Sequence, residues 1–243
     1  MLVTIRPAPG GIGGVIAAPP SKSMAHRAVL CAALAVGRSH ITHLEFSKDI
    51  SATLSAAAQL CAAVDTGADN ATVQGLGHFL SLTAPVDCCE SGSTLRFLIP
   101  IASLTGQPVT FTGRGRLMER PQSVYETLYR EQNLRFEQSP AGLTVEGALT
   151  PGDYRLAGNV SSQFISGLLF ALPLLPGDSQ LHLIPPVESR SYIDMTRAVQ
   201  AAGWTKPPCC CPAGSSTTPA TTTWRAITVR PPFRRCWVQC AAG

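Results

Sequence analysis

The sequence lacks any apolar run that approaches the roughly 18 residues needed to span a membrane. Residues 1–7 lack the basic start and long apolar stretch of a secretory signal peptide. The sequence patterns of a nucleophile elbow, a P-loop and a dinucleotide-binding G-x-G-x-x-G are also absent. These absences exclude several common enzyme classes, and they predict a cytoplasmic protein that has no membrane partner.

Acidic residues are missing from residues 205–243, which contain five Lys or Arg residues. The chain has 19 basic and 15 acidic residues, so residues 1–204 hold 14 basic residues against all 15 acidic ones, a net charge of −1. A uniformly basic surface is therefore not indicated, and we expect no nucleic-acid partner. A nucleic-acid-binding function would rest on residues 205–243 alone.

Metal-ligand spacing is missing as well. The consecutive Cys209, Cys210 and Cys211 lack the two-residue gap that lets a Cys pair bind zinc, and the five histidines share no ligand spacing with carboxylates. No metal site is expected. The earlier cysteines are expected to be small buried hydrophobic residues in a reducing cytosol: Cys31, Cys61, Cys88 and Cys89.

The remaining sequence features recur at a spacing of about 70 residues. Three hydroxyl-rich clusters begin at Ser21, Ser91 and Ser161, each 70 residues after the last. Helix boundary signals and apolar runs predict a first helix in each unit (24–36, 95–104, 164–175) and a second helix (48–63, 121–132, 192–202). Short β-branched or alternating runs predict strands at 40–42, 108–111, 143–146 and 180–184. The pattern predicts an α/β (α+β) domain with threefold internal pseudo-symmetry.

The first cluster has the composition of an anion site. A helix N-terminus presents free N–H groups and a partial positive charge. Ser23 and Arg27 are four residues apart and share a helical face, and Lys22 precedes that turn. These groups suit a phosphate or a carboxylate. A solvated, well-capped helix explains them equally well.

The other clusters present similar signals. Gly92 would let a ligand approach the backbone closely, and Arg120 stands directly before Pro121, a residue expected to begin a helix. Ordinary capped helices and an exposed arginine are the alternatives. If the repeat is structural, these groups lie at equivalent corners and converge on one anionic ligand. The remaining polar candidates are Ser161, Ser162, Gln163, Ser189 and Tyr192.

Five segments together resemble the enolpyruvylshikimate-phosphate synthases. They occur in the family's order over residues 1 to about 204 and read PSKSMAHRA (20–28), SGSTLR (91–96), RLMERP (116–121), GNVSSQFIS (158–166) and SRSYID (189–194). The sister family that acts on a UDP-sugar has a Lys-Asn pair in place of Lys22-Ser23. The match is therefore specific.

The resemblance implies a fold and a reaction. The fold is an enolpyruvyl-transferase-like domain of three βαβαββ repeats, one of two similar domains in the family. The reaction transfers the enolpyruvyl group of phosphoenolpyruvate to the 5-hydroxyl of shikimate 3-phosphate and releases phosphate, in aromatic amino-acid biosynthesis. No metal or organic cofactor is implied, and we expect a monomer.

The resemblance also implies the role of each site residue. Lys22 would contact both substrates, and Ser23 and Arg27 would bind shikimate 3-phosphate. Gly92 and Arg120 would hold phosphoenolpyruvate. The shikimate 3-phosphate side would be lined by Ser161, Ser162, Gln163, Ser189 and Tyr192. No residue of this chain is expected to match the family's catalytic base.

Two departures from the family limit these expectations. Glu90 stands where many members have Asn. The chain has about half the family's length, and the family's carboxylate base, further arginines and second lysine come from the other domain. Residues 1–204 are therefore expected to be the first domain, inactive in transfer when alone. A non-catalytic half-domain that binds phosphate ligands is the alternative function.

Residues 205–243 do not resemble the family and are expected to form a poorly ordered tail. Back-translation of residues 209–240 in a shifted reading frame allows a peptide that is similar to the family's continuation. A frameshift shortly after Trp204 is the hypothesis that follows. Resequencing of the gene around codon 205 would test it.

Overall fold

The structure is a computed structural model that describes residues 3–4 and 18–201. The helices within this part are α1 (Lys22–Leu34), α2 (Lys48–Leu60), α3 (Gly92–Ala102), α4 (Ser123–Glu131), α5 (Ser162–Ala171) and α6 (Arg190–Ala201). Short 3₁₀ turns over Ser103–Thr105 and Leu172–Leu174 extend α3 and α5. The strands are β1 (Gly37–Thr42), β2 (Ala62–Thr66), β3 (Asn70–Gly75), β4 (Val86–Asp87), β5 (Val109–Thr112), β6 (Arg135–Ser139), β7 (Gly142–Glu146), β8 (Asp153–Ala157) and β9 (Gln180–Ile184).

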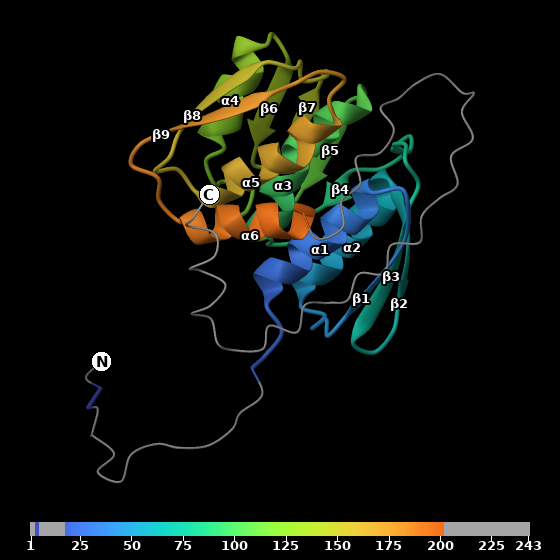
Figure 1. Cartoon of the computed structure of the whole chain (residues 1–243). Helices are drawn as coiled ribbons and strands as arrows, with labels where there is room; N and C mark the ends of the chain where they lie inside the picture. Colours follow the sequence, from blue (N-terminus) through green and yellow to red (C-terminus); the bar gives the residue numbers. More distant parts are fainter. Residues whose placement is uncertain (1–2, 5–17, 202–243) are drawn as a thin grey trace.

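The strands form three sheets around a helical interior (Figure 1). The first sheet has the order β1-β3-β2 and is antiparallel throughout. The second has the order β4-β5-β7-β6, in which only β4 and β5 are parallel. The third is the parallel pair β8-β9, in register from Asp153 opposite Gln180 to Ala157 opposite Ile184. The fold is therefore the mixed α/β class that the sequence predicted.

The element order repeats along the chain. A complete βαβαββ succession runs from β4 to β7, an αβαββ succession precedes it from α1 to β3, and βαβα follows it from β8 to α6. The first helices of the three units begin at Lys22, Gly92 and Ser162, each 70 residues apart, as the serine clusters predicted.

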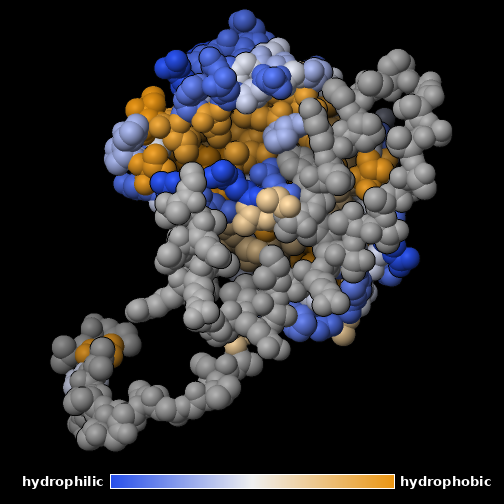
Figure 2. Space-filling model, in the orientation of Figure 1, coloured by the Kyte–Doolittle hydropathy of each residue, from blue (hydrophilic) through white to orange (hydrophobic). Residues whose placement is uncertain are grey.

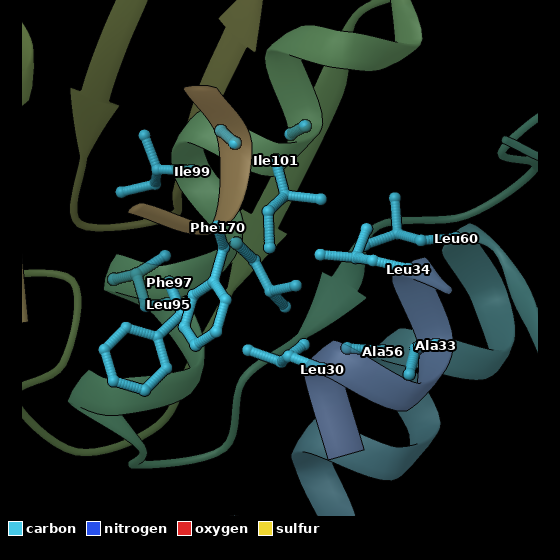
Figure 3. Packing of buried hydrophobic residues seen from close by; sticks show 14 of the residues in the cluster. Leu30, Ala33, Leu34, Ala56, Leu60, Leu95, Phe97, Ile99, Ile101 and Phe170 are labelled. Carbon is cyan, nitrogen blue, oxygen red and sulfur yellow. The ribbon is translucent and has the colours of Figure 1, made fainter. Parts of the chain in front are cut away.

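The core lies where these helices meet. Figure 3 shows Leu34 of α1 near Leu60 of α2 and Leu30 near Ala56, with Phe97 of α3 and Phe170 of α5 on the other side of Leu30. The two phenylalanine rings meet edge to face, with 5.4 Å between their centroids. A continuous apolar core therefore joins all three units.

Helix α3 contains a proline whose effect the neighbouring helix compensates. Pro100 has no N–H, so the carbonyl oxygen of Arg96, four residues earlier, loses its helical donor. The buried hydroxyl of Tyr125, on α4, donates to this oxygen at 2.7 Å. Gly167 of α5 allows the close packing, because a Cβ there would lie 2.2 Å from the Tyr125 hydroxyl oxygen and 2.5 Å from the Arg96 carbonyl oxygen.

Several predicted helix boundaries are wrong; the predicted helix 24–36, for example, ends at Leu34. The predicted helix 48–63 ends at Leu60, because Ala62 and Ala63 pair with β3 and this pairing outweighs the helix propensity of alanine. The helix predicted to begin at Pro121 begins at Ser123. Residues 120–122 instead form an irregular segment before the helix, in which the Gln138 side chain donates to the Arg120 carbonyl oxygen at 2.9 Å.

The outer strand β9 has no partner on its second edge among the described residues. Its counterpart β5 pairs on both edges and has its apolar side chains fully buried, whereas Ile184 of β9 is 54% exposed. Figure 2 shows apolar surface over the part of the molecule where β8, β9 and α5 lie. The third sheet is thus the least covered of the three.

Some predictions fall outside the described residues. These are the poorly ordered tail 205–243, its frameshift origin, the boundary at residue 204 and the last residue of the predicted helix 192–202. Within residues 3–4 and 18–201, no helix combines the length and apolar character needed to cross a membrane.

Candidate functional site

Three capped helix starts form the framework of the site. The side chains of Ser21, Ser91 and Ser161 accept hydrogen bonds from backbone N–H groups in the first turns of α1, α3 and α5, at 3.4, 3.2 and 3.4 Å. Each serine is the N-cap that its position predicted. Every one of these helices therefore directs the positive end of its dipole to the serine cluster that precedes it.

Lys22 is the first residue of α1 and lies at the surface. Its ammonium group forms an ion pair with the carboxylate of Asp49, in the first turn of α2. The Lys22 side chain is 53% exposed, and that of Asp49 is 24% exposed. The lysine is therefore accessible and held by a partner on a second helix.

Arg27 is buried, in contrast, and joins three helices. Its guanidinium donates to the Thr196 hydroxyl at 2.7 Å, the Ser23 carbonyl oxygen at 2.8 Å, and the Ser166 hydroxyl and Tyr192 carbonyl oxygen at 3.2 Å each. If each bond takes one N–H, one of the five guanidinium N–H groups remains. Burial lowers the pKa of Arg27 to about 10, so it is still a cation at neutral pH.

A second group of residues surrounds the start of α3. The Gln163 side chain accepts from Arg96 at 2.8 Å and donates to the Ser93 hydroxyl at 2.8 Å. The Arg96 guanidinium stacks on the Phe164 ring, with its central carbon 4.6 Å from the ring centroid. Burial lowers the pKa of Arg96, and the nearby cation of Arg120 lowers it further. Two cations thus lie close together beside α3.

Gly92 borders this group. A Cβ at residue 92 would lie 2.9 Å from a terminal nitrogen of Arg120 and 3.9 Å from the side-chain oxygen of Gln163. The absence of a side chain therefore lets the exposed Arg120 approach the first turn of α3. The structure brings together three residues, Gly92, Arg120 and Gln163, that are separate in the sequence.

The remaining predicted site residues have local partners. Ser161 is exposed, and Ser162, the first residue of α5, is buried. Ser189 has a positive φ of 51°, in the left-handed region, and its carbonyl oxygen accepts from the Tyr192 amide at 3.0 Å. The exposed Tyr192 ring lies 5.9 Å from the Arg27 guanidinium carbon.

Six of the predicted residues form two contact groups, Ser23 and Tyr192 around Arg27 and Arg120 and Gln163 around Gly92. Lys22 belongs to neither, since it pairs with Asp49. Helix α5 belongs to both, because Gln163 reaches the second group and Ser166 the first. Prediction from the sequence missed Asp49 and Arg96. Arg96 had a usable signal, since it lies four residues after Gly92 on the same helix, whereas an acid in a first turn is too common to single out Asp49.

The fold and the site define a repeated α/β domain with cations, hydroxyls and helix starts suited to a small anionic ligand. Residues 7–202 match the family described as EPSP synthase (3-phosphoshikimate 1-carboxyvinyltransferase). The chain therefore belongs to the EPSP synthase family.

Individual relatives agree with this assignment. The 3-phosphoshikimate 1-carboxyvinyltransferase of Clostridium kluyveri is 45% identical over 190 residues, which cover 77% of this chain and 45% of the relative. That of Clostridium beijerinckii is 44% identical over 205 residues, covering 80% and 47%. The chain spans about half the length of the curated relatives that it matches.

A solved structure shares the fold. The EPSP synthase of Acinetobacter baumannii matches with a TM-score of 0.67 at 23% identity, over 79% of this chain and 44% of that chain. At this identity, the likeness shows the enolpyruvyl-transferase-like fold alone.

Proposed function

We propose that this chain binds shikimate 3-phosphate and phosphoenolpyruvate, and that it serves the transfer of the enolpyruvyl group to the 5-hydroxyl of shikimate 3-phosphate with release of phosphate. The reaction belongs to the shikimate pathway of aromatic amino-acid biosynthesis. The observation that carries the proposal is the grouping of Gly92, Arg120 and Gln163 at a capped helix start, in a chain of the EPSP synthase family.

The two substrates are assigned to adjacent parts of the site, with Lys22 in contact with both. Shikimate 3-phosphate lies near Lys22, Ser23 and the one free N–H of Arg27, with Ser161, Ser162, Gln163, Ser189 and Tyr192 on its other side. Phosphoenolpyruvate lies at Gly92 and Arg120. Both substrates carry phosphate and carboxylate groups, and charge-assisted hydrogen bonds to such groups are the strong ones. The same cations would stabilise the phosphate as it leaves.

Turnover by the 243-residue chain alone is not expected. Transfer requires a proton to reach the methylene carbon of phosphoenolpyruvate and another to leave the attacking hydroxyl, and such acid–base help is typically worth ~10²–10⁴-fold. The site described above contains cations and hydroxyls, while its single carboxylate, Asp49, is paired with Lys22. Binding without catalysis is the outcome that this composition supports.

Calorimetry at low salt tests the binding. We expect heat with shikimate 3-phosphate, weaker binding as salt rises because the site is open to solvent, and much weaker binding of shikimate without its phosphate. Lys22→Gln should weaken binding roughly 10- to 100-fold. Lys48→Gln is the matched control, since Lys48 is also an exposed first residue of a helix and carries the same charge.

Phosphoenolpyruvate binding is tested with a second variant and its matched control. Arg120→Gln should weaken phosphoenolpyruvate binding, whereas Arg116→Gln, an exposed arginine paired with Glu119, should not. The absence of heat with both substrates at millimolar concentration would contradict the proposal. An assay of phosphate release separates a binding half-domain from an active transferase, because only the latter releases phosphate.

We also propose that the chain acts as a monomer in the cytoplasm. The four cysteines of the described residues are unpaired, which suits a reducing compartment. Sedimentation of the purified chain tests the oligomeric state.

A further inference from the structure

A buried chain of polar side chains lies behind the starts of α1, α2 and α3. The His26 Nδ1 atom is 2.7 Å from the Thr53 hydroxyl, which is 2.7 Å from the Thr94 hydroxyl, which is 2.7 Å from the Ser91 hydroxyl. None of the four residues is more than 1% exposed. Burial of so many polar groups is tolerated only when they bond to one another, and the chain joins three helices at the level of the site.

The series of hydroxyl groups also contacts Asp49, the residue that pairs with Lys22. The backbone carbonyl oxygen of Asp49 lies 3.1 Å from the Thr53 hydroxyl and 3.4 Å from the Thr94 hydroxyl. The carboxylate of the same residue pairs with Lys22. The two threonine hydroxyls therefore lie within hydrogen-bonding distance of the backbone of the residue that pairs with Lys22.

The unpaired Nε2 atom of His26 indicates where the imidazole proton lies in this series of side chains. His26 Nε2 is buried and has no hydrogen-bond partner. An unpaired N–H costs more free energy in this buried position than an unpaired nitrogen lone pair. The proton therefore belongs on Nδ1, which then donates to the Thr53 hydroxyl. Burial lowers the pKa of His26 to about 4, and the imidazole is neutral at pH 7. With Nδ1 as the donor, the Thr53 hydroxyl accepts there and keeps its single proton for one of two acceptors, the Asp49 carbonyl oxygen or the Thr94 hydroxyl.

We infer that this hydrogen-bonded series of side chains, from His26 to Ser91, positions Lys22 for its anionic ligand. Thr53 is the central positioning residue. The inference rests on the proposed function, in which Lys22 contacts the substrates. Thr53 itself is completely buried, so it has no surface with which to contact a ligand. It acts through the Asp49 backbone and the Asp49–Lys22 pair.

The test compares Thr53→Val, which removes the hydroxyl at nearly constant shape, with Thr53→Ser, which retains it. Thr53→Val should weaken shikimate 3-phosphate binding about 3- to 10-fold, and Thr53→Ser less than about twofold. A residue that merely stabilises the fold would not change affinity measured far below the unfolding midpoint. Equal affinity of Thr53→Val and wild type would overturn the inference and leave the proposed function intact.

A double-mutant cycle identifies the route. In a Lys22→Gln background, Thr53→Val should change affinity less than about twofold, because the group through which it acts is gone. Its effect on the unfolding midpoint should remain the same in both backgrounds. An undiminished loss of affinity in the Lys22→Gln background would contradict the route through Lys22.

A measurement without ligand keeps the inference separate from the proposed function. The chain has three lysines, Lys22, Lys48 and Lys206, so ¹³C-lysine labelling gives few NMR signals to assign. Thr53→Val should move the Lys22 ε-methylene signal in the direction that Asp49→Asn moves it. Thr53→Ser should not move it.

This readout decides the matter even if the wild type binds no shikimate 3-phosphate, a result that would defeat the proposed function alone. An unmoved Lys22 signal in a folded Thr53→Val chain would overturn the inference. Should Thr53→Val fail to fold, Thr94→Val carries the same expectations, because it removes the other hydroxyl on the Asp49 carbonyl oxygen.

Discussion

Replacement of Tyr125 by Phe would test how α4 secures α3. The Tyr125 hydroxyl donates at 2.7 Å to the Arg96 carbonyl oxygen, which Pro100 leaves without its helical N–H, and lies 3.0 Å from the Phe164 carbonyl oxygen of α5. Phenylalanine has the same ring and lacks only the donor. The substitution therefore leaves a buried carbonyl oxygen unpaired and creates almost no cavity.

The expected cost follows from that single loss. A buried acceptor that loses its donor costs ~1–3 kcal/mol. The middle of this range, about 2 kcal/mol, corresponds to a fall in Tm of about 4–8 °C for a domain of this size. Urea denaturation followed by circular dichroism measures the change in the free energy of unfolding.

A second substitution shows whether Pro100 is the cause. Pro100→Ala restores an N–H that can donate to the Arg96 carbonyl oxygen, so Tyr125→Phe should cost under about 1 kcal/mol in that background. Tyr129→Phe is the matched control, because its hydroxyl donates to the Ile99 carbonyl oxygen at 2.8 Å and its cost should be equal in both backgrounds. Costs of Tyr125→Phe that agree within ~0.5 kcal/mol between the two backgrounds would refute the reasoning.

Three further predictions concern the site. Gly92→Ala should weaken phosphoenolpyruvate binding about 3- to 10-fold by calorimetry, because the new Cβ displaces Arg120. Its free energy of unfolding should stay within about 0.5 kcal/mol of wild type or rise, because alanine favours helix. Burial lowers the pKa of His26 from 6.5 to about 4, so the unfolded chain takes up the proton at a higher pH than the folded one. The contribution of His26 to the free energy of unfolding is therefore complete above pH 6.5 and is lost as the pH falls toward 4. Denaturation across this window should show a loss about 3 kcal/mol larger for wild type than for His26→Gln, and equal losses would count against a buried neutral imidazole. Ser21→Ala should lower the free energy of unfolding by ~1 kcal/mol through loss of the α1 N-cap, and no change would mean that the first turn of α1 is held by its packing alone.

The helix starts could be predicted because their signals are local. A capping serine followed by an apolar run is enough to predict where α1, α3 and α5 begin, and the structure agrees within three residues. Strands β2, β3, β4, β6 and β8 were missed. β6 is polar and mostly exposed, and it exists because β7 pairs with it rather than because of its own composition.

The sequence indicates the residue types of the candidate site but not how far each side chain is buried. Arg27 could be recognised as a cation beside a helix start. Its hydrogen-bond partners Ser166 and Thr196 lie 139 and 169 residues away, so no local pattern could indicate that most of its guanidinium is used within the protein. An arginine that joins helices and one that waits for a ligand have the same sequence signature, and only the tertiary contacts distinguish them.

The repeat explains how one backbone presents three kinds of chemistry. The first residues of α1, α3 and α5 are equivalent in position, and each helix directs the same partial charge toward its cap. At this position the chain has Lys22, Gly92 and Ser162, which provide a charge, an open approach to the backbone and a hydroxyl. A symmetric site would suit a symmetric ligand. The two substrates proposed above, each with phosphate and carboxylate groups, would require unequal corners, and divergence at equivalent positions supplies them without any change in the fold.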